Sequence, residues 1–176
     1  MFAAGSNFGD NDFMAALNEF RYDSGDQSVK DFYKGLFKAN YVANLVIENF
    51  QNGLPNGGQT ATTQRCVAEA RVLRALVYFY LTALWDTPPF IDHVISDGLP
   101  YNCDADPNNP KTHDELMKWV ASECEDALPY LDERASTSDK AGAVKVTKGL
   151  ANALAGKASI FVKDYANAKI ALKKVI

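Results

Sequence analysis

The sequence contains no apolar run of the roughly 18 residues that a membrane-spanning helix needs. It also has no cluster of cations: 18 lysines and arginines against 22 acidic side chains give a net charge of −4. Nucleic acids and anionic membranes are bound through clustered cations, so we expect neither as a partner. With 176 residues, of which 47% are hydrophobic, the chain can form one domain with a buried core.

Cysteine is scarce. The three cysteines, Cys66, Cys103 and Cys124, include no Cys-x-x-Cys pair, so no zinc site is expected. Cys66 and Cys124 fall in segments with helical periodicity, where a small buried apolar role is the simplest interpretation. A disulfide among the three is left open, because the sequence does not fix the redox compartment.

Signatures of catalysis are missing as well. His93 and His113 are the only histidines, and neither accompanies a serine or cysteine in a nucleophile motif such as G-x-S-x-G. The glycine pair at 57–58 is an isolated turn and not a phosphate-binding loop. Carboxylates such as Glu123 and Asp126 fall on helices near lysine or arginine, which predicts that they are solvated. We therefore expect no enzymatic site and no cofactor.

One long segment carries most of the information, RCVAEARVLRALVYFYLTALWDTPPF from Arg65 to Phe90. Its apolar and small residues recur every three or four positions, which predicts a helix from about Thr62 to Trp85 with one buried face. The aromatic run at 78–80 predicts that the second half is covered almost all round. The prolines at 88–89 end the helix, because proline donates no N–H and restricts the residue before it. The predicted buried face comprises Cys66, Ala70, Leu73, Val77, Tyr80, Leu81 and Leu84.

Further helices are predicted from the residues that can cap their first turns. Ser28, with Asp31 three residues later, predicts a helix cap and a helix to about residue 50. Thr112 and Glu115 predict a capping box that opens a helix reaching Leu131. Two more helices are expected at about 147–162 and 165–176. Strand patterns are essentially absent, so the predicted fold is all-α, with a loop over 91–111.

The helices form pairs, at about 28–86 and 112–163, and residues 164–176 begin a third unit of a single helical-repeat domain over 1–176. The segment LAGKASIFVKDYANAKIALKKV resembles a tetratricopeptide repeat, with Ala158 and Ala168 where helices approach closely. Lys163 stands where glycine is usual in that turn. The apolar face of the last helix has nothing downstream to cover it, so we expect a fragment of a longer protein.

The segment AEARVLRALVYFYLTALWDTPPF closely resembles the core helix of the SusD/RagB family. NYVANLVIENF, with Asn40, Asn44 and Asn49, ECEDALPYL and VTKGLANALAGKASIFVKDYANAKIALKKVI resemble further segments of that family in the same order. One departure is Asp86, near the helix end where the family favours glycine. An aspartate there predicts a less easy left-handed cap or another exit from the helix.

The resemblance implies a non-catalytic lipoprotein at the surface of the outer membrane. Such a protein captures oligosaccharides or polysaccharides and delivers them to a TonB-dependent, SusC-like transporter. The first residues, MFAAGSNFGDND, have neither the basic nor the apolar region of a secretory signal, so we expect the export signal and lipid anchor to lie outside this chain. The alternative is a helical-repeat adaptor that binds a protein or peptide in its groove.

Two aromatic–polar pairs are candidates for glycan binding, which requires exposed aromatic faces beside amides or carboxylates on loops. They are Tyr101–Asn102 in the long loop and Tyr22–Asp23 before the first helix. For each pair, an ordinary polar loop is the alternative interpretation.

A calcium loop is a further open alternative. Asp104, Asp106 and Asn108, with Glu115, have the spacing of calcium ligands in a twelve-residue loop. A glycine and a proline upstream exclude the first helix of an EF-hand, and Glu115 already has a role in the predicted capping box. The sequence therefore does not establish a metal site.

Overall fold

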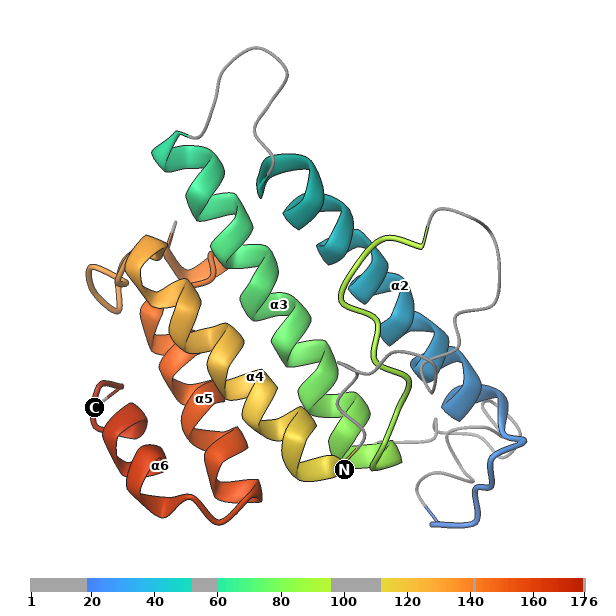
Figure 1. Cartoon of the computed structure of the whole chain (residues 1–176). Coiled ribbons are helices and arrows are strands. Elements are labelled where there is room, and N and C mark those ends of the chain that lie inside the picture. Colours follow the sequence, from blue (N-terminus) through green and yellow to red (C-terminus); the bar gives the residue numbers. More distant parts are fainter. Residues whose placement is uncertain (1–18, 52–59, 96–111, 141, 176) are drawn as a thin grey trace. The chain divides into compact units, whose positions relative to one another are not determined.

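The structure is a computed structural model that describes residues 19–51, 60–95, 112–140 and 142–175. These residues form helices and no strand, which confirms the all-α prediction. The helices are α2 (Gln27–Gln51), α3 (Ala61–Trp85), α4 (His113–Ala127), α5 (Lys148–Phe161) and α6 (Tyr165–Leu172), with short 3-10 turns η2 (Leu128–Tyr130) and η3 (Gly142–Val144) (Figure 1).

The chain divides into two compact units, residues 1–38 and 39–176. In the described part of the first unit, residues 19–26 lead into the first half of α2, where the rings of Tyr33 and Phe37 pack with centroids 4.9 Å apart. A single domain over 1–176 stays a prediction.

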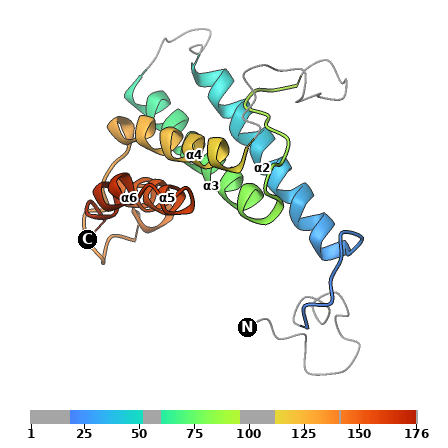
Figure 2. The same ribbon diagram turned by 60° about the horizontal axis from the view of Figure 1, so that its bottom comes forward.

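In the second unit, helices that follow one another in the chain pack side by side. α4 lies between α3 and α5, and α6 packs against α5 (Figures 1 and 2). This succession of packed helices is the predicted helical-repeat arrangement. Its core contains fully buried aliphatic side chains from α3 and α4: Val72, Leu81, Leu116, Met117 and Val120.

The buried face of α3 differs from the prediction. Leu73, Tyr80 and Leu84 were expected to be buried, but their exposed fractions are 47%, 42% and 58%. Of the aromatic run, Tyr78 and Phe79 are buried and Tyr80 is exposed. The physical reason is geometric: consecutive helical residues are about 100° apart around the axis, so three in a row cannot all face the same neighbour.

The predicted capping box at the start of α4 is confirmed. The Thr112 hydroxyl accepts from the Glu115 backbone N–H, and the Glu115 carboxylate accepts from the Thr112 N–H at 3.0 Å. Helix α4 is shorter than predicted: it ends at Ala127 and continues as the 3-10 turn η2, because Pro129 has no N–H to extend the α-helical ladder.

The prediction that Ser28 caps the first long helix is wrong. Helix α2 already begins at Gln27, and the Asp26 carbonyl accepts from the Lys30 N–H at 3.0 Å. Asp31 instead accepts a hydrogen bond from the Gln27 amide at 2.7 Å. Ser28 therefore lies within the first turn of α2 and not at its N-cap position.

The turn between α5 and α6 keeps the geometry of a glycine-terminated helix although a lysine occupies it. Lys163 has a φ of 61°. Its N–H donates to the Ile160 carbonyl at 3.0 Å, and the Asp164 N–H donates to the Ser159 carbonyl at 2.9 Å, which together form a Schellman motif. The Asp164 carboxylate then caps α6 by accepting from the Asn167 N–H, and this hydrogen bond lowers the pKa of Asp164.

Small residues let α5 and α6 approach closely. Ala158 and Ala168 are buried, as predicted. Gly156 is a third such position: a Cβ atom there would lie 2.6 Å from Cγ of Leu172, closer than two carbon atoms can pack. The last helix ends at Leu172 and not at Ile176, and residues 173–175 form turns.

Both cysteines in the described residues are free thiols, Cys66 half-buried and Cys124 buried. Burial, reinforced by the nearby charges of Glu123 and Glu125, raises the pKa of Cys124 to about 12. Cys103 lies outside the described residues. Among the helices described, none combines the length and apolar character that crossing a membrane would require.

Replacing Lys163 by glycine should stabilise the protein by about 0.5–1 kcal/mol. A side chain in the left-handed region costs about 1–2 kcal/mol, and the greater backbone entropy of glycine in the unfolded chain offsets part of the gain. Urea denaturation followed by circular dichroism measures the difference.

The matched control is Lys169→Gly, which changes an exposed lysine inside α6. That variant should lose about 0.5–1 kcal/mol, because glycine is a poor helix former. Equal destabilisation by both variants would contradict the strained geometry assigned to Lys163.

Candidate binding site

The exit from α3 is an unusual turn at Asp86. Its φ is 62° and its ψ is −76°. The Asp86 N–H still donates to the Thr82 carbonyl at 2.9 Å, and the Thr87 N–H donates to the Trp85 carbonyl at 2.7 Å, which closes a γ-turn. A γ-turn with a positive central φ is rare and strained. The departure expected at Asp86 is therefore present, as another exit path and not a left-handed cap.

After this turn, residues 89–94 run past α3 and α2 and are held by side chains; we call them the anchored segment. Tyr78 of α3, fully buried, binds the segment through its hydroxyl. That oxygen accepts from the Ile91 N–H at 2.6 Å and donates to the Pro89 carbonyl at 3.1 Å. Tyr78 thus fixes the path of the chain directly after the prolines.

Helix α2 holds the same segment with polar residues spaced four apart, on one face of the helix. Asn40 donates to the Ile91 carbonyl at 2.8 Å. Asn44 donates to the Ile91 carbonyl at 3.1 Å and to the His93 carbonyl at 3.0 Å. Glu48 accepts from the Val94 N–H. Both asparagines are buried. Their amides therefore supply the hydrogen bonds that these backbone carbonyls would otherwise form with water.

Arg74 of α3 joins the anchored segment to α4. Its Nη1 donates to Asn44 Oδ1 and to the Asp92 carbonyl, both at 2.8 Å. Its Nη2 donates to Glu123 Oε2 at 2.6 Å. Arg74 and Glu123 are each only 6% exposed. The guanidinium also lies over the Trp119 ring, with Cζ 5.3 Å from the ring centroid.

The second oxygen of Glu123 binds another arginine. Arg71 donates to Glu123 Oε1 from Nη2 at 2.7 Å and from Nε at 3.2 Å, and Nη2 also contacts Asp126 Oδ2 at 3.1 Å. Burial lowers the pKa of Arg71, but the hydrogen bonds and charges of Glu123 and Asp126 outweigh it, so the pKa is raised. The carboxylate of Glu123 is therefore compensated on both oxygens. We call Asn44, Arg71, Arg74 and Glu123 the arginine network.

An aromatic cluster seals one side of this network. Tyr78, Phe90 and Trp119 contact one another in tilted or edge-on geometry, with centroid separations of 5.3 Å, 5.1 Å and 4.9 Å. Such ring pairs contribute more to the stability of the fold than the burial of their apolar area alone would give. Because the rings exclude water, the hydrogen bonds of Arg74 act in surroundings of low polarity, where they are stronger.

The interpretation of Glu123 as a solvated surface carboxylate was wrong. Glu123 follows Leu116 and Val120 on the buried face of α4, where the side chains of α3 meet it. The signal was available: Glu123 continues the same three- and four-residue spacing as the apolar residues before it. Arg71 and Arg74, three apart on α3, supply the charges that allow a carboxylate on that face.

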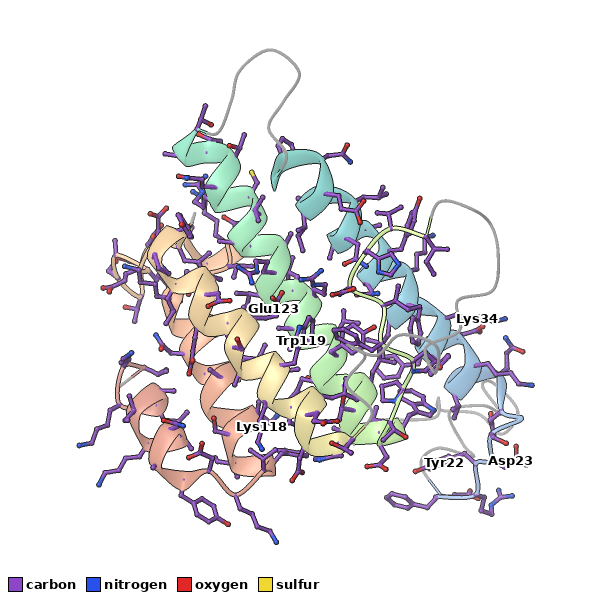
Figure 3. The ribbon with its side chains drawn as sticks, in the orientation of Figure 1. Tyr22, Asp23, Lys34, Lys118, Trp119 and Glu123 are labelled. Carbon is purple, nitrogen blue, oxygen red and sulfur yellow. The ribbon has the colours of Figure 1, made fainter. Side chains whose placement is uncertain are left out.

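The candidate glycan-binding pairs lie elsewhere in the chain. Tyr22 and Asp23 are neighbours in the segment before α2, and Tyr22 is 50% exposed (Figure 3). The Asp23 carboxylate already accepts from the Gly25 N–H at 2.6 Å, which closes a local turn. Tyr101 and Asn102 lie outside the described residues, as do Asp104, Asp106 and Asn108. In the described ranges, no group of three His, Cys, Asp or Glu side chains is arranged to hold a metal ion.

Solved structures with the same arrangement of helices are known. A SusD-like carbohydrate-binding protein from Bacteroides fragilis matches with a TM-score of 0.69 and 22% identity, over 88% of this chain and 28% of that one. A laminarin-binding SusD-like protein matches with a TM-score of 0.73 and 19% identity, over 97% and 34% of the two chains. The chain has the SusD-like fold.

Surface glycan-binding protein A from Bacteroides thetaiotaomicron, solved with laminarihexaose, matches this chain with a TM-score of 0.70 and 18% identity, over 96% of this chain and 32% of that one. The chain thus spans about a third of the length of the solved proteins it matches. No protein-family model and no curated protein sequence matches it.

Replacing Glu123 by alanine should lower the free energy of unfolding by about 3–5 kcal/mol. The substitution leaves the buried charge of Arg74 without its carboxylate, and removing one partner of a buried pair is strongly destabilising. Urea denaturation of the variant measures the loss.

Asp126→Ala is the matched control, because it removes the other carboxylate that contacts Arg71, and its side chain is 58% exposed. That change should cost less than about 1 kcal/mol. Similar losses for both variants would show that Glu123 is not the centre of the network.

Proposed function

We propose that this chain is the helical-repeat portion of a non-catalytic glycan-binding protein of the outer-membrane surface. It captures oligosaccharides or polysaccharides and delivers them to a TonB-dependent, SusC-like transporter for nutrient uptake. The SusD-like fold supports this proposal, together with the names of proteins that share the fold, which describe carbohydrate, laminarin and glycan binding. A lipid anchor holds the protein at the membrane.

The anchored segment is the observation that carries the proposal. Side chains from α2 and α3 fix residues 89–94, and Glu123 of α4 fixes Arg74 in turn. Residues 96–111, which contain Tyr101 and Asn102, follow directly. A binding loop that leaves a rigid scaffold from a fixed point loses less entropy on binding, so the scaffold favours recognition by loop residues.

The chemistry of the described residues supports a binder over a catalyst. The carboxylate of Glu123 is buried and both of its oxygens accept from arginine donors, so it is not presented to a substrate. The Cys124 thiol has a pKa of about 12, so it is protonated near neutral pH and is not a nucleophile.

The chain should bind at least one neutral polysaccharide, measured by native electrophoresis in gels that contain laminarin, starch or xylan. Tyr101→Ala should weaken the retardation about tenfold, which corresponds to about 1.4 kcal/mol for one lost aromatic contact. Tyr22→Ala tests the second candidate pair in the same gels.

Tyr165→Ala is the control, since Tyr165 is a 65% exposed tyrosine of α6. It should leave the retardation unchanged. If no polysaccharide retards the chain, or if all three tyrosine variants behave alike, glycan binding by the proposed pairs is contradicted.

The full-length gene product, purified from detergent-solubilised outer membrane, should co-purify with a large TonB-dependent transporter in stoichiometric amount. Mass spectrometry of the purified material identifies the partner. Recovery of soluble proteins alone, or a product that is not membrane-anchored, would favour the helical-repeat adaptor instead.

A further inference from the structure

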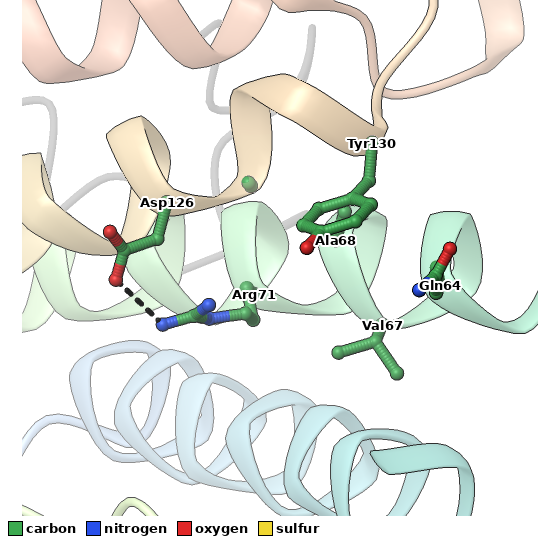
Figure 4. Close-up of a pocket in the computed structure, with 7 residues that line it drawn as sticks. Gln64, Val67, Ala68, Arg71, Asp126 and Tyr130 are labelled. Carbon is green, nitrogen blue, oxygen red and sulfur yellow. Dashed lines mark hydrogen bonds and ion pairs between the residues drawn. The ribbon is translucent and has the colours of Figure 1, made fainter. Parts of the chain in front are cut away.

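A small pocket lies on the surface of the second unit, between the first half of α3 and the end of α4 (Figure 4). Its volume is about 190 Å³. The lining residues are Gln64, Val67, Ala68 and Arg71 of α3, Asp126 and Ala127 of α4, and Tyr130 of η2. The anchored segment contributes nothing to this lining, and Arg71 is the one residue that the pocket shares with the arginine network.

The pocket combines an aromatic face with polar groups that are available to a ligand. The ring of Tyr130, 48% exposed, stands beside Ala68 in the wall of the pocket (Figure 4). Within the part of the chain that the structure describes, neither the Gln64 amide nor the Tyr130 hydroxyl has a hydrogen-bond partner. Asp126 uses Oδ2 for Arg71, and its side chain is 58% exposed. Donors and acceptors thus surround an apolar surface.

The charges in the lining of the pocket cancel. The two charged lining residues, Arg71 and Asp126, pair with each other at 3.1 Å, and Arg71 also pairs with Glu123 at 2.7 Å. A bound anion or cation would have to compete with these pairs. A neutral ligand with hydroxyl groups meets no such penalty, because it can both donate and accept hydrogen bonds.

Contacts outside the pocket restrain the backbone of its walls. Arg65 at the start of α3 pairs with Asp132, just after η2, at 3.0 Å. Pro129 restricts the backbone of η2 beside Tyr130. On the other side, Arg71 is held by Glu123. Backbone that is restrained in this way loses less conformational entropy on binding, which favours even a small ligand.

We propose that this pocket binds one neutral sugar ring, as a saccharide contact additional to the main glycan site; this rests on the proposed function. The apolar face of the ring lies against Tyr130, and its hydroxyl groups pair with the Gln64 amide and the Asp126 carboxylate. Pockets for larger ligands enclose about 300–1,000 Å³, so the small volume accepts a single ring, such as the terminal residue or a side branch of a glycan.

The test is an amide NMR titration of the 176-residue chain with the methyl glycosides of glucose, galactose and mannose. At least one neutral glycoside should cause saturable shifts of the amides of Gln64, Val67 and Tyr130. Glucuronate and glucosamine should bind no more tightly than that glycoside, because the charges of the pocket cancel.

Variants identify the contacts. Tyr130→Ala should weaken the affinity about tenfold, and Gln64→Ala should weaken it about threefold or more, in line with the loss of one hydrogen bond. Tyr130→Phe keeps the ring and removes the hydroxyl, so it separates stacking from hydrogen bonding and guards against a folding defect. Tyr165→Ala serves as the unchanged control.

The outcomes distinguish a failure of the pocket proposal from a failure of the proposed function. Retardation by a polysaccharide without any shift at the pocket would overturn the second contact and leave the proposed function standing. Shifts at the pocket without retardation would support the pocket and contradict the main site. Tighter binding of a charged sugar, or unchanged affinity in both Tyr130 variants, would overturn the neutral-ring assignment.

Discussion

The buried ion pair between Arg74 and Glu123 is the interaction on which the rest of the structure depends. Taking two charges out of water costs several kcal/mol for each, so a buried pair is tolerated only when its remaining donors and acceptors are satisfied. Here Arg71 occupies the second oxygen of Glu123, and Asn44 and the Asp92 carbonyl accept from Nη1 of Arg74, so that among its nitrogens only the buried Nε lacks a partner in the described residues. These requirements bring α2, α3, α4 and the anchored segment to one place, because the pair is satisfied only there.

The arginine network specifies a single arrangement of the helices more than it adds to the free energy of unfolding. A well-packed apolar core could replace it at similar free energy, but apolar contacts have little directional preference. The hydrogen bonds of Asn44 and Arg74 have defined lengths and angles, so a shift of α2 by one turn would leave several buried polar groups unpaired. For a protein whose function is recognition, such a scaffold keeps its surface features at constant spacing. The pocket beside Arg71 benefits from the same rigidity.

Local features of the fold were predictable from the sequence, and features that depend on a distant partner were not. Three local features each depend on a few neighbouring residues: the end of α3 before the prolines, the capping box of Thr112 and the glycine-like turn at Lys163. The burial of Glu123 and the exposure of Tyr80 depend on which helix packs against which face. The family resemblance indicated the SusD-like fold. The pocket at Tyr130 could not be foreseen, because its shape depends on the spacing between α3 and the chain after α4.

The anchored segment has a further consequence for the behaviour of the protein in solution. Exposed extended chain is a template on which other molecules can add a β-strand, and proteins must protect such edges against aggregation. In this segment, side chains of the same protein bind the carbonyls of Pro89, Ile91, Asp92 and His93 and the N–H groups of Ile91 and Val94. Pro89 in the segment and Pro88 just before it have no N–H at all. The polar side chains that position the segment thus also prevent it from serving as an edge for intermolecular pairing.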